Sequence, residues 1–266
     1  MPIQVRDKRS KIRIGLVSLY DPNASFIIDR MIAAGETPND ARKQLINTTV
    51  KGLKGTNYWA SSRGIYFEAA HGPISACLNW KSGSFNLTPV NAPTFTVNQG
   101  YQSDGATSYL DSNYNPTIEE GFQQDSAHLS IWSRTDVQSG MGDVGTTNSQ
   151  ISSRSATDAF NHRINGAASL NAATCAVLNG TGHFVSSRTL SASCRGYTNG
   201  SPLAGEQALV STAPDNNTIR FCGRGGSIQY SARQQAFGSF GLGLSAADIA
   251  DAYPIILSYM QGVGAA

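Results

Sequence analysis

The feature that most constrains the fold is a series of short alternating segments that fills the chain from about Phe85 onward. In each segment apolar and polar residues follow one another with period two or with strand-like composition, the pattern of a half-buried β-strand. Turn dipeptides such as Asp104-Gly105, Asn165-Gly166 and Asn199-Gly200 separate many of the segments. Regular short strands joined by such turns predict a β-sandwich or a barrel.

Charge and composition narrow the range of functions. Charged residues are 14% of the 266 residues and the formal net charge is +2, which is typical of sandwiches with many polar turns. A chain of this length buries one sizeable core, so we expect one main domain. The basic run at residues 6–13 lacks the interleaved aromatic side chains of a nucleic-acid groove, and the apolar run at 12–20 is too short to span a bilayer. We predict no nucleic-acid binding, no signal peptide and no membrane insertion.

Two helical segments precede the predicted strands. Asp21-Pro22 is a helix start with proline at the first position, and Gly35 ends this segment. Thr37 is placed to cap the amide of Asp40, and the next helix runs to Gly55 with one apolar face. A helix-turn-helix DNA-binding motif is disfavoured, because the second helix needs its apolar face buried elsewhere.

The end of the chain predicts a further helix. Ser245 and Asp248 form a variant of the capping box, and apolar residues between 249 and 260 share one face before Gly262. Pro254 lies inside this segment, where a proline costs about 3 kcal/mol. We therefore expect a kink or two short helices, with the apolar face covering one end of the sandwich.

The chain is divided into three parts by these patterns. We predict an extended N-terminal arm at residues 1–20, a helical attachment segment at 21–84 and a β-sandwich with a terminal helix at 85–266. The sequence changes character at residues 78–80.

The sandwich region resembles a known family. The runs NLTPVNAPTFT (86–96), GYQSDGATSYLD (100–111) and SAHLSIWSR (126–134), and the ending LGLSAADI (242–249), are similar to bacteriophage and prophage structural proteins with a laminin-G-like domain. The helical lead-in is similar as well, so the resemblance covers about residue 21 to the end. It implies a mostly-β, concanavalin-type antiparallel sandwich (jelly roll) with an N-terminal helical segment and a C-terminal helix. Pro254 and the basic arm depart from the family's pattern.

No catalytic residues are predicted. Glucanases with this type of sandwich use a Glu-x-Asp-x-Glu strand, which places two carboxylates on one face, and this chain has no such motif. Glu119 and Glu120 are adjacent and would point to opposite faces of a strand. A hydrolase that uses Asp pairs brought together by folding stays open as an alternative.

Several other patterns favour a structural interpretation. Residues 140–145 match G-x-G-x-x-G, but no helix-forming sequence follows, so we predict a polar loop and no dinucleotide cofactor. Asp104, Asp111 and Asn113 offer oxygen ligands for calcium, yet they are also ordinary turn residues, and we favour the turn. We predict no metal site and no cofactor.

Histidines and cysteines are scattered without ligand spacing. We expect the histidines to be ordinary polar or half-buried residues: His71, His128, His162 and His183. We expect the cysteines to be buried free thiols, with a cross-strand Cys194–Cys222 disulfide as the alternative: Cys77, Cys175, Cys194 and Cys222.

Aromatic side chains are available for a carbohydrate platform, but a core position is equally compatible with each of them. These residues are Tyr101, Tyr109, Tyr114, Tyr197 and Trp132. No ligand-binding residue is therefore assigned.

The resemblance implies a non-enzymatic virion surface protein, a tail-fibre tip or a capsid decoration. We expect it to mediate adhesion to host-surface glycans, to contact other virion proteins through its arm and helices, and to form a homo-oligomer. The alternatives are a polysaccharide depolymerase and a purely structural capsid decoration protein.

Overall fold

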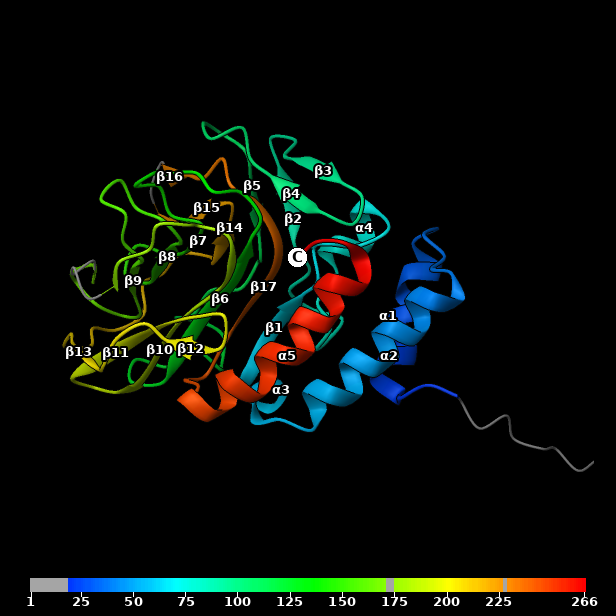
Figure 1. Cartoon of the computed structure of the whole chain (residues 1–266), viewed down its shortest axis with the longest axis horizontal. Coiled ribbons are helices and arrows are strands. Elements are labelled where there is room, and N and C mark those ends of the chain that lie inside the picture. Colours follow the sequence, from blue (N-terminus) through cyan, green and yellow to red (C-terminus); the bar gives the residue numbers. More distant parts are fainter. Residues whose placement is uncertain (1–18, 171–174, 227–228) are drawn as a thin grey trace, which may run out of the picture.

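The chain forms stacked antiparallel sheets with helices from both ends of the sequence (Figure 1). The computed structural model describes residues 19–170, 175–226 and 229–266, so almost all of the predicted arm lies outside the described residues. The helices are α1 (Pro22–Ala33), α2 (Asp40–Lys54), α3 (Asn57–Ser61), α4 (Pro73–Cys77) and α5 (Ala246–Val263).

Seventeen strands are assigned in the described part of the chain. They are β1 (Ser62–Tyr66), β2 (Thr88–Val90), β3 (Thr94–Thr96), β4 (Gly100–Gln102), β5 (Tyr109–Asp111), β6 (Ala127–Ser133), β7 (Val144–Gly145), β8 (Gln150–Ser152), β9 (Asn161–Arg163), β10 (Gly182–Leu190), β11 (Ser193–Thr198), β12 (Ser201–Pro202), β13 (Gln207–Ala208), β14 (Arg220–Phe221), β15 (Gly223–Arg224), β16 (Gln229–Tyr230) and β17 (Gln234–Gly241).

Two sheets make up the sandwich. The large one has nine strands in the order β12-β11-β10-β6-β17-β4-β3, with β1 paired to β17 and β13 paired to β11. The smaller one has six strands in the order β2-β5-β14-β7-β8-β9, and β15 and β16 form a separate pair. The predicted fold class, a mostly-β antiparallel sandwich with N-terminal helices and a C-terminal helix, is confirmed.

The large sheet is buried on both faces. Along β6, Leu129 and Ile131 belong to the apolar cluster shared with the smaller sheet, whereas Trp132 belongs to the cluster shared with the helices. In β10, Phe184 and Val185 divide in the same way. Successive strand residues point to opposite faces, so one face meets the second sheet and the other is covered by α1, α2 and α5.

The large sheet draws on residues before 85. Strand β1 lies within the predicted helical segment 21–84 and pairs with β17, Ile65 opposite Ser239. The helices of this segment thus pack on the sheet to which their own chain contributes a strand.

Helix α2 begins as predicted at Asp40, but its cap differs. The side chain of Asn39 accepts from the amide of Arg42 at 2.8 Å, so the expected cap by Thr37 is wrong. Asn39 directly precedes the first helical residue, which is the position from which a side chain reaches the free amides. Gly55 ends the helix as expected.

Helix α5 corrects three expectations. The capping box of Ser245 and Asp248 is present, but the helix continues through Pro254 as one piece and ends at Gly264, whose φ is 73°. Pro254 is on the exposed side, where water can bind the carbonyl that its missing N–H leaves free. The buried face of α5 packs on a face of the large sheet and on α2, not on one end of the sandwich.

Candidate functional site

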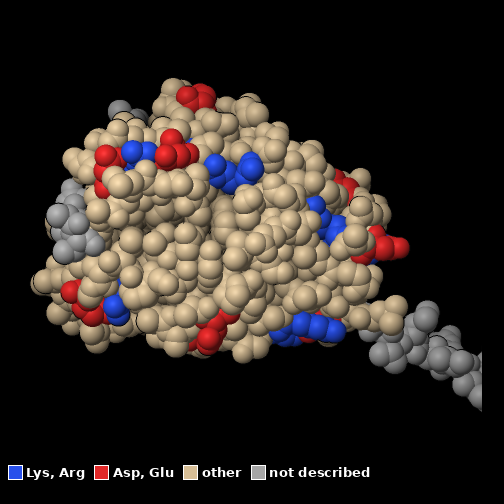
Figure 2. Space-filling view, in the orientation of Figure 1, with Lys and Arg blue, Asp and Glu red and all other residues tan. Residues whose placement is uncertain are grey.

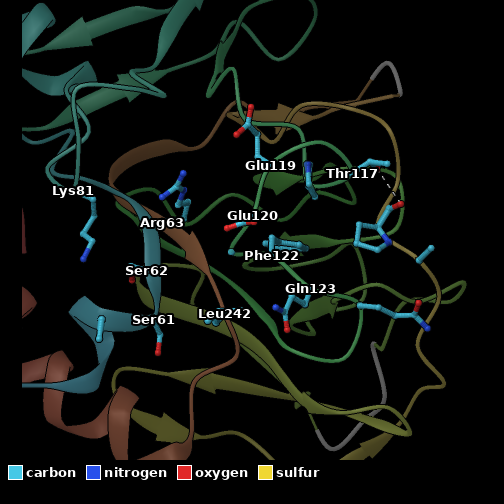
Figure 3. A pocket seen from close by; sticks show the side chains of 16 residues that line it. Ser61, Ser62, Arg63, Lys81, Thr117, Glu119, Glu120, Phe122, Gln123 and Leu242 are labelled. Carbon is cyan, nitrogen blue, oxygen red and sulfur yellow. Dashed lines mark hydrogen bonds between the residues drawn. The ribbon is translucent and has the colours of Figure 1, made fainter.

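A cleft of about 920 Å³ lies where the helical segment meets the sandwich. Its two sides carry different side chains: Lys81 and Arg63 come from one side, while Glu119, Glu120 and Gln123 come from the other (Figure 3). The lining is drawn from residues 60–63, 81, 116–117, 119–124, 213–214 and 242. Segments far apart in the sequence thus converge on one polar hollow.

The basic side rests on aromatic rings. Lys81 Nζ lies 4.3 Å from the ring centroid of Trp59 in α3 and donates to its carbonyl oxygen at 2.5 Å. The Arg63 guanidinium, from β1, is 5.5 Å from the ring centroid of Phe85. Such cation–π contacts hold the long side chains in place without neutralising their charge.

A single buried residue positions both cations. Asn79 has no exposed surface, and its Oδ1 accepts from the amide of Lys81 at 3.0 Å and from the amide of Ile65 at 3.2 Å. Its Nδ2 donates to the carbonyl of Arg63 at 3.3 Å. The loop that carries Lys81 is therefore tied to the strand that carries Arg63.

The acidic side of the cleft is a turn that a buried tyrosine stabilises. The Tyr114 hydroxyl lies 3.2 Å from the Glu119 carbonyl and 2.9 Å from the Glu120 carbonyl, and can donate to either. These carbonyls face the core, and both carboxylate side chains line the cleft. Glu119 and Glu120 line the same cleft although they are adjacent, because residues 116–121 form a turn and not a strand.

Gly121 brings the two sides together. Its φ of 100° lies in the region that favours glycine. A Cβ built on it would lie 3.4 Å from Cδ of Arg63. The Arg63 stem thus runs directly over the turn that carries the two glutamates.

Partial burial changes the pKa of the lysine on the basic side of the cleft. Loss of solvent, with smaller contributions from the positive charges of Arg63 and Lys54, lowers the pKa of Lys81 to about 8. A cation held under these conditions is stabilised by any anion that enters the cleft. Sugar hydroxyls can bind the carboxylates and amides opposite, through charge-assisted hydrogen bonds.

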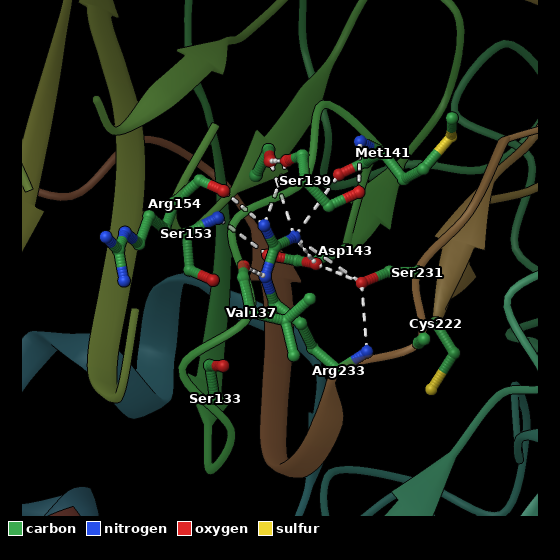
Figure 4. Close-up of polar contacts among 12 residues, drawn as sticks. Ser133, Val137, Ser139, Met141, Asp143, Ser153, Arg154, Cys222, Ser231 and Arg233 are labelled. Atoms are coloured by element: carbon green, nitrogen blue, oxygen red, sulfur yellow. Dashed lines mark hydrogen bonds and ion pairs between the residues drawn. The ribbon is translucent and has the colours of Figure 1, made fainter. Parts of the chain in front are cut away.

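A second polar centre is fully buried and holds a loop (Figure 4). Arg233 and Asp143 have no exposed surface and pair at 2.7 Å. Arg233 also donates to the carbonyls of Val137 and Ser139, and Asp143 accepts from the amide of Ser153 at 2.6 Å. The pair fixes the 137–143 loop against β8, and we assign it a structural role.

Three of the four histidines are fully buried, which corrects the expectation of half-buried residues. Burial lowers the pKa of His128 and His162 to about 4 and that of His183 to about 3. His128 Nδ1 donates to the carbonyl of Leu242 at 2.6 Å, and His162 Nε2 donates to Gln207 at 2.9 Å. They are neutral, hydrogen-bonded core residues.

The candidate calcium residues Asp104 and Asp111 instead accept hydrogen bonds from nearby backbone amides. Asp104 Oδ1 accepts from the amides of Ala106, Thr107 and Ser108, and these bonds lower its pKa. Asp111 accepts from the amide of Asn113 at 2.8 Å. Within the described ranges no group of three or more potential ligands is placed to hold a metal.

Most of the aromatic candidates are core residues. Tyr101, Tyr114, Tyr197 and Trp132 are at most 5% exposed. Tyr109 is half-buried, and its ring is covered by the Arg220 guanidinium at 4.1 Å. Of the two interpretations that the sequence left open, the core position holds for four of these five side chains.

The remaining sequence patterns are structural. Residues 140–145 form a loop that ends in β7, with no helix after it. All four cysteines are buried thiols, so the Cys194–Cys222 disulfide is absent. No described helix is long and apolar enough to cross a membrane.

The cleft could not be predicted from the sequence. Lys81 and Arg63 lie in a segment that carries no chemical motif, and adjacent glutamates are not a recognised signal. Only the fold brings them together.

The comparisons identify the fold. No protein-family model and no curated protein matches the chain. A mutant of Trypanosoma rangeli sialidase with trans-sialidase activity matches with a TM-score of 0.55 and 14% identity, over 82% of this chain and 39% of that one. This chain thus spans about two fifths of the sialidase, with which it shares the β-sandwich fold.

Two further matches have TM-scores below 0.5. The binding domain of botulinum neurotoxin serotype D matches at 0.47 with 14% identity, over 75% of this chain and 52% of that one. Domain 4 of an arabinanase from Geobacillus stearothermophilus, in complex with arabinotriose, matches at 0.42 with 11% identity, over 72% and 98%.

Proposed function

We propose that this chain is a non-enzymatic surface protein of a bacteriophage particle, a tail-fibre tip or a capsid decoration, that binds host-surface glycans in the cleft between β1 and residues 116–124. The observation that carries the proposal is the cleft itself. It combines two cations, two carboxylates and the amides of Gln123 and Gln124. These groups bind the hydroxyls and charges of a sugar without a deep apolar pocket.

The comparisons support the glycan part of this proposal. The solved structure that matches with a TM-score of 0.55 is a sialidase mutant, and the match covers 39% of that protein. This similarity in fold to a protein that acts on sugars supports sugar binding by the sandwich.

The particle setting is supported by the sequence resemblance to phage structural proteins. In this proposal the arm at residues 1–20 and the outer side of α1, where Phe26 and Ile32 are exposed, contact other virion proteins or sister chains. The inner faces of α1, α2 and α5 are buried on the sheet, so they are not available for that purpose.

A second candidate function is hydrolysis of a surface polysaccharide. Glu119 and Glu120 line one cleft, and glycoside hydrolysis uses a pair of carboxyl groups. An Asp pair is less suitable: Asp136 and Asp158 are brought together, but both pair with Arg154, at 2.8 and 2.7 Å. Carboxylates held in ion pairs with an arginine are poorly suited to act as a general acid.

A glycan array tests the binding function. Labelled chain is applied to immobilised bacterial surface glycans, and any polysaccharide that binds is incubated with the chain and examined for released oligosaccharides. Retention without cleavage is expected. Release that Glu120→Gln abolishes would favour the depolymerase, and the absence of any bound glycan, with full occupancy on capsids, would favour a purely structural decoration protein.

The particle setting needs its own test. Antibodies against the chain are expected to label intact phage particles in electron micrographs, and the purified chain is expected to be an oligomer. A purified chain that is monomeric, together with particles that the antibodies do not label, would contradict this part of the proposal.

A further inference from the structure

The basic side of the cleft carries two cations that are not in ion pairs with any carboxylate that the structure describes. In the described residues neither Arg63 nor Lys81 forms an ion pair with a carboxylate, whereas Lys54, Arg154 and Arg233 all do. The face of the molecule in Figure 2 shows charged side chains singly or in small mixed groups, with no surface of one sign. The cleft therefore holds two nearby positive charges that no carboxylate pairs within the described residues.

These cations are held in place although each repels the other. Buried Asn79 binds the backbone of both residues, and aromatic rings support both head groups. The positive charge of Arg63 is one of the causes that lower the pKa of Lys81 to about 8. A fold that keeps two cations together at the edge of a cleft provides a fixed site for an anionic group.

The opposite side of the cleft excludes a ligand that is anionic throughout. Glu119 and Glu120 would repel a second anionic group, but they accept hydrogen bonds from hydroxyls. The site thus matches a ligand with one acidic group at one end and hydroxyls at the other.

We propose that the cleft binds an acidic sugar residue, with its anionic group between Arg63 and Lys81 and its hydroxyls on Glu119 and Glu120. This inference rests on the proposed glycan-binding function. A carboxylate and a sulfate present the same chemistry to an Arg–Lys pair, so both kinds of acidic sugar are included.

The test compares matched sugars by calorimetric titration of the full chain. The probes are a hexuronic acid oligosaccharide, the same oligosaccharide after reduction of its carboxyl groups to alcohols, and a sulfated hexose oligosaccharide. We expect at least one acidic form to bind about tenfold more tightly than the neutral form, since charge-assisted hydrogen bonds add to the shared hydroxyl contacts. The acidic probe that binds identifies the anionic group.

Variants then show which residues cause the preference for the acidic probe. Arg63→Gln and Lys81→Gln are each expected to remove most of it, Lys81→Arg to retain it, and Lys51→Gln, a matched exposed lysine on α2, to leave it unchanged. Thermal unfolding of each variant confirms that it folds. Affinity of wild type for the acidic probe is also expected to fall as pH rises through about 8, because Lys81 then loses its charge, and Lys81→Arg is expected to abolish this pH effect.

The outcomes distinguish a failure of the acidic-sugar inference from a failure of the proposed glycan-binding function. If the neutral oligosaccharide binds as tightly as the acidic ones, the acidic-sugar inference is wrong and the glycan-binding function stands. If the acidic probes bind but Arg63→Gln and Lys81→Gln do not weaken them, the site is wrongly placed. If no probe binds and the glycan array is also blank, the proposed function itself fails.

Discussion

Three buried histidines are expected to make the folded protein less stable at acidic pH. The folded protein keeps His128, His162 and His183 neutral, with pKa values of about 4, 4 and 3, whereas in the unfolded chain they take up protons below about pH 6.5. The unfolded state then binds more protons, so stability falls as pH drops from about 6.5 to 4. Each histidine contributes about 1.4 kcal/mol per pH unit.

Urea unfolding between pH 4 and 7 measures this effect. His162→Gln keeps a hydrogen-bonding side chain that cannot be protonated, so we expect it to reduce the slope of stability against pH by about 1.4 kcal/mol per pH unit. An unchanged slope in this variant would contradict the assignment of His162 as a buried neutral residue.

Glu68 has the opposite pH dependence. It is fully buried, neither carboxyl oxygen has a hydrogen-bond partner within the described residues, and burial raises its pKa to about 8. The unfolded chain ionises Glu68 above about pH 4.5 while the folded protein keeps its proton, so Glu68 lowers stability between pH 4.5 and 8. The cost is on the order of 3 kcal/mol at pH 7.

Glu68→Gln removes the ionisation and keeps the shape of the side chain. Its stability relative to wild type is expected to rise steadily from pH 4.5 to 8 and then level off. A difference that stays constant across this range, measured by urea unfolding, would show that Glu68 does not retain its proton.

Asn79 is the residue on which the geometry of the cleft depends most. Its side chain makes bonds to Ile65, Lys81, Arg63, Ser82 and Ser84. Asn79→Ala leaves buried backbone groups without partners, and we expect a loss of about 2 to 4 kcal/mol in the free energy of unfolding. The exposed control Asn216→Ala is expected to cost less than about 1 kcal/mol, so similar losses in the two variants would contradict the role given to Asn79.

At the scale of elements, local signals in the sequence predicted where helices begin better than which residues cap them. The Ser245–Asp248 capping box and the Asp21-Pro22 start are both where the sequence places them. The cap of α2 was assigned to Thr37 because Thr37 and Asn39 both precede Asp40, and only the backbone conformation selects Asn39. No local signal in the sequence marks the turn that Tyr114 stabilises, so the shared cleft of Glu119 and Glu120 was not predictable.

Pro254 provides a test at this scale. Since α5 continues through it, Pro254→Ala restores a backbone hydrogen bond inside an intact helix. We expect a gain of about 1 to 2 kcal/mol in unfolding free energy, after allowing for the greater freedom of the unfolded chain. Ser258→Ala, one turn further on the same exposed side, is expected to change stability by less than about 0.5 kcal/mol, and a Pro254→Ala variant no more stable than this control would contradict the prediction.

At the scale of the whole molecule, the period of the strands predicted the sandwich but not what covers it. A sheet buried on both faces places His128, Ser130 and Ser239 against the helices, and the sequence gives no sign that such polar residues are internal. Strand β1 was not expected for a related reason: its partner β17 lies more than 150 residues further along the chain. The cleft is formed by this same long-range pairing, so it was not predictable from local patterns.

The central claim, that glycans bind in the cleft beside β1, is tested most directly by filling the cleft. Ala60 lines it and is exposed, and Ala33, an exposed alanine at the end of α1, is the matched control. On a glycan array, Ala60→Trp is expected to lose the binding of wild type and Ala33→Trp to retain it. Undiminished binding by Ala60→Trp would contradict the claim.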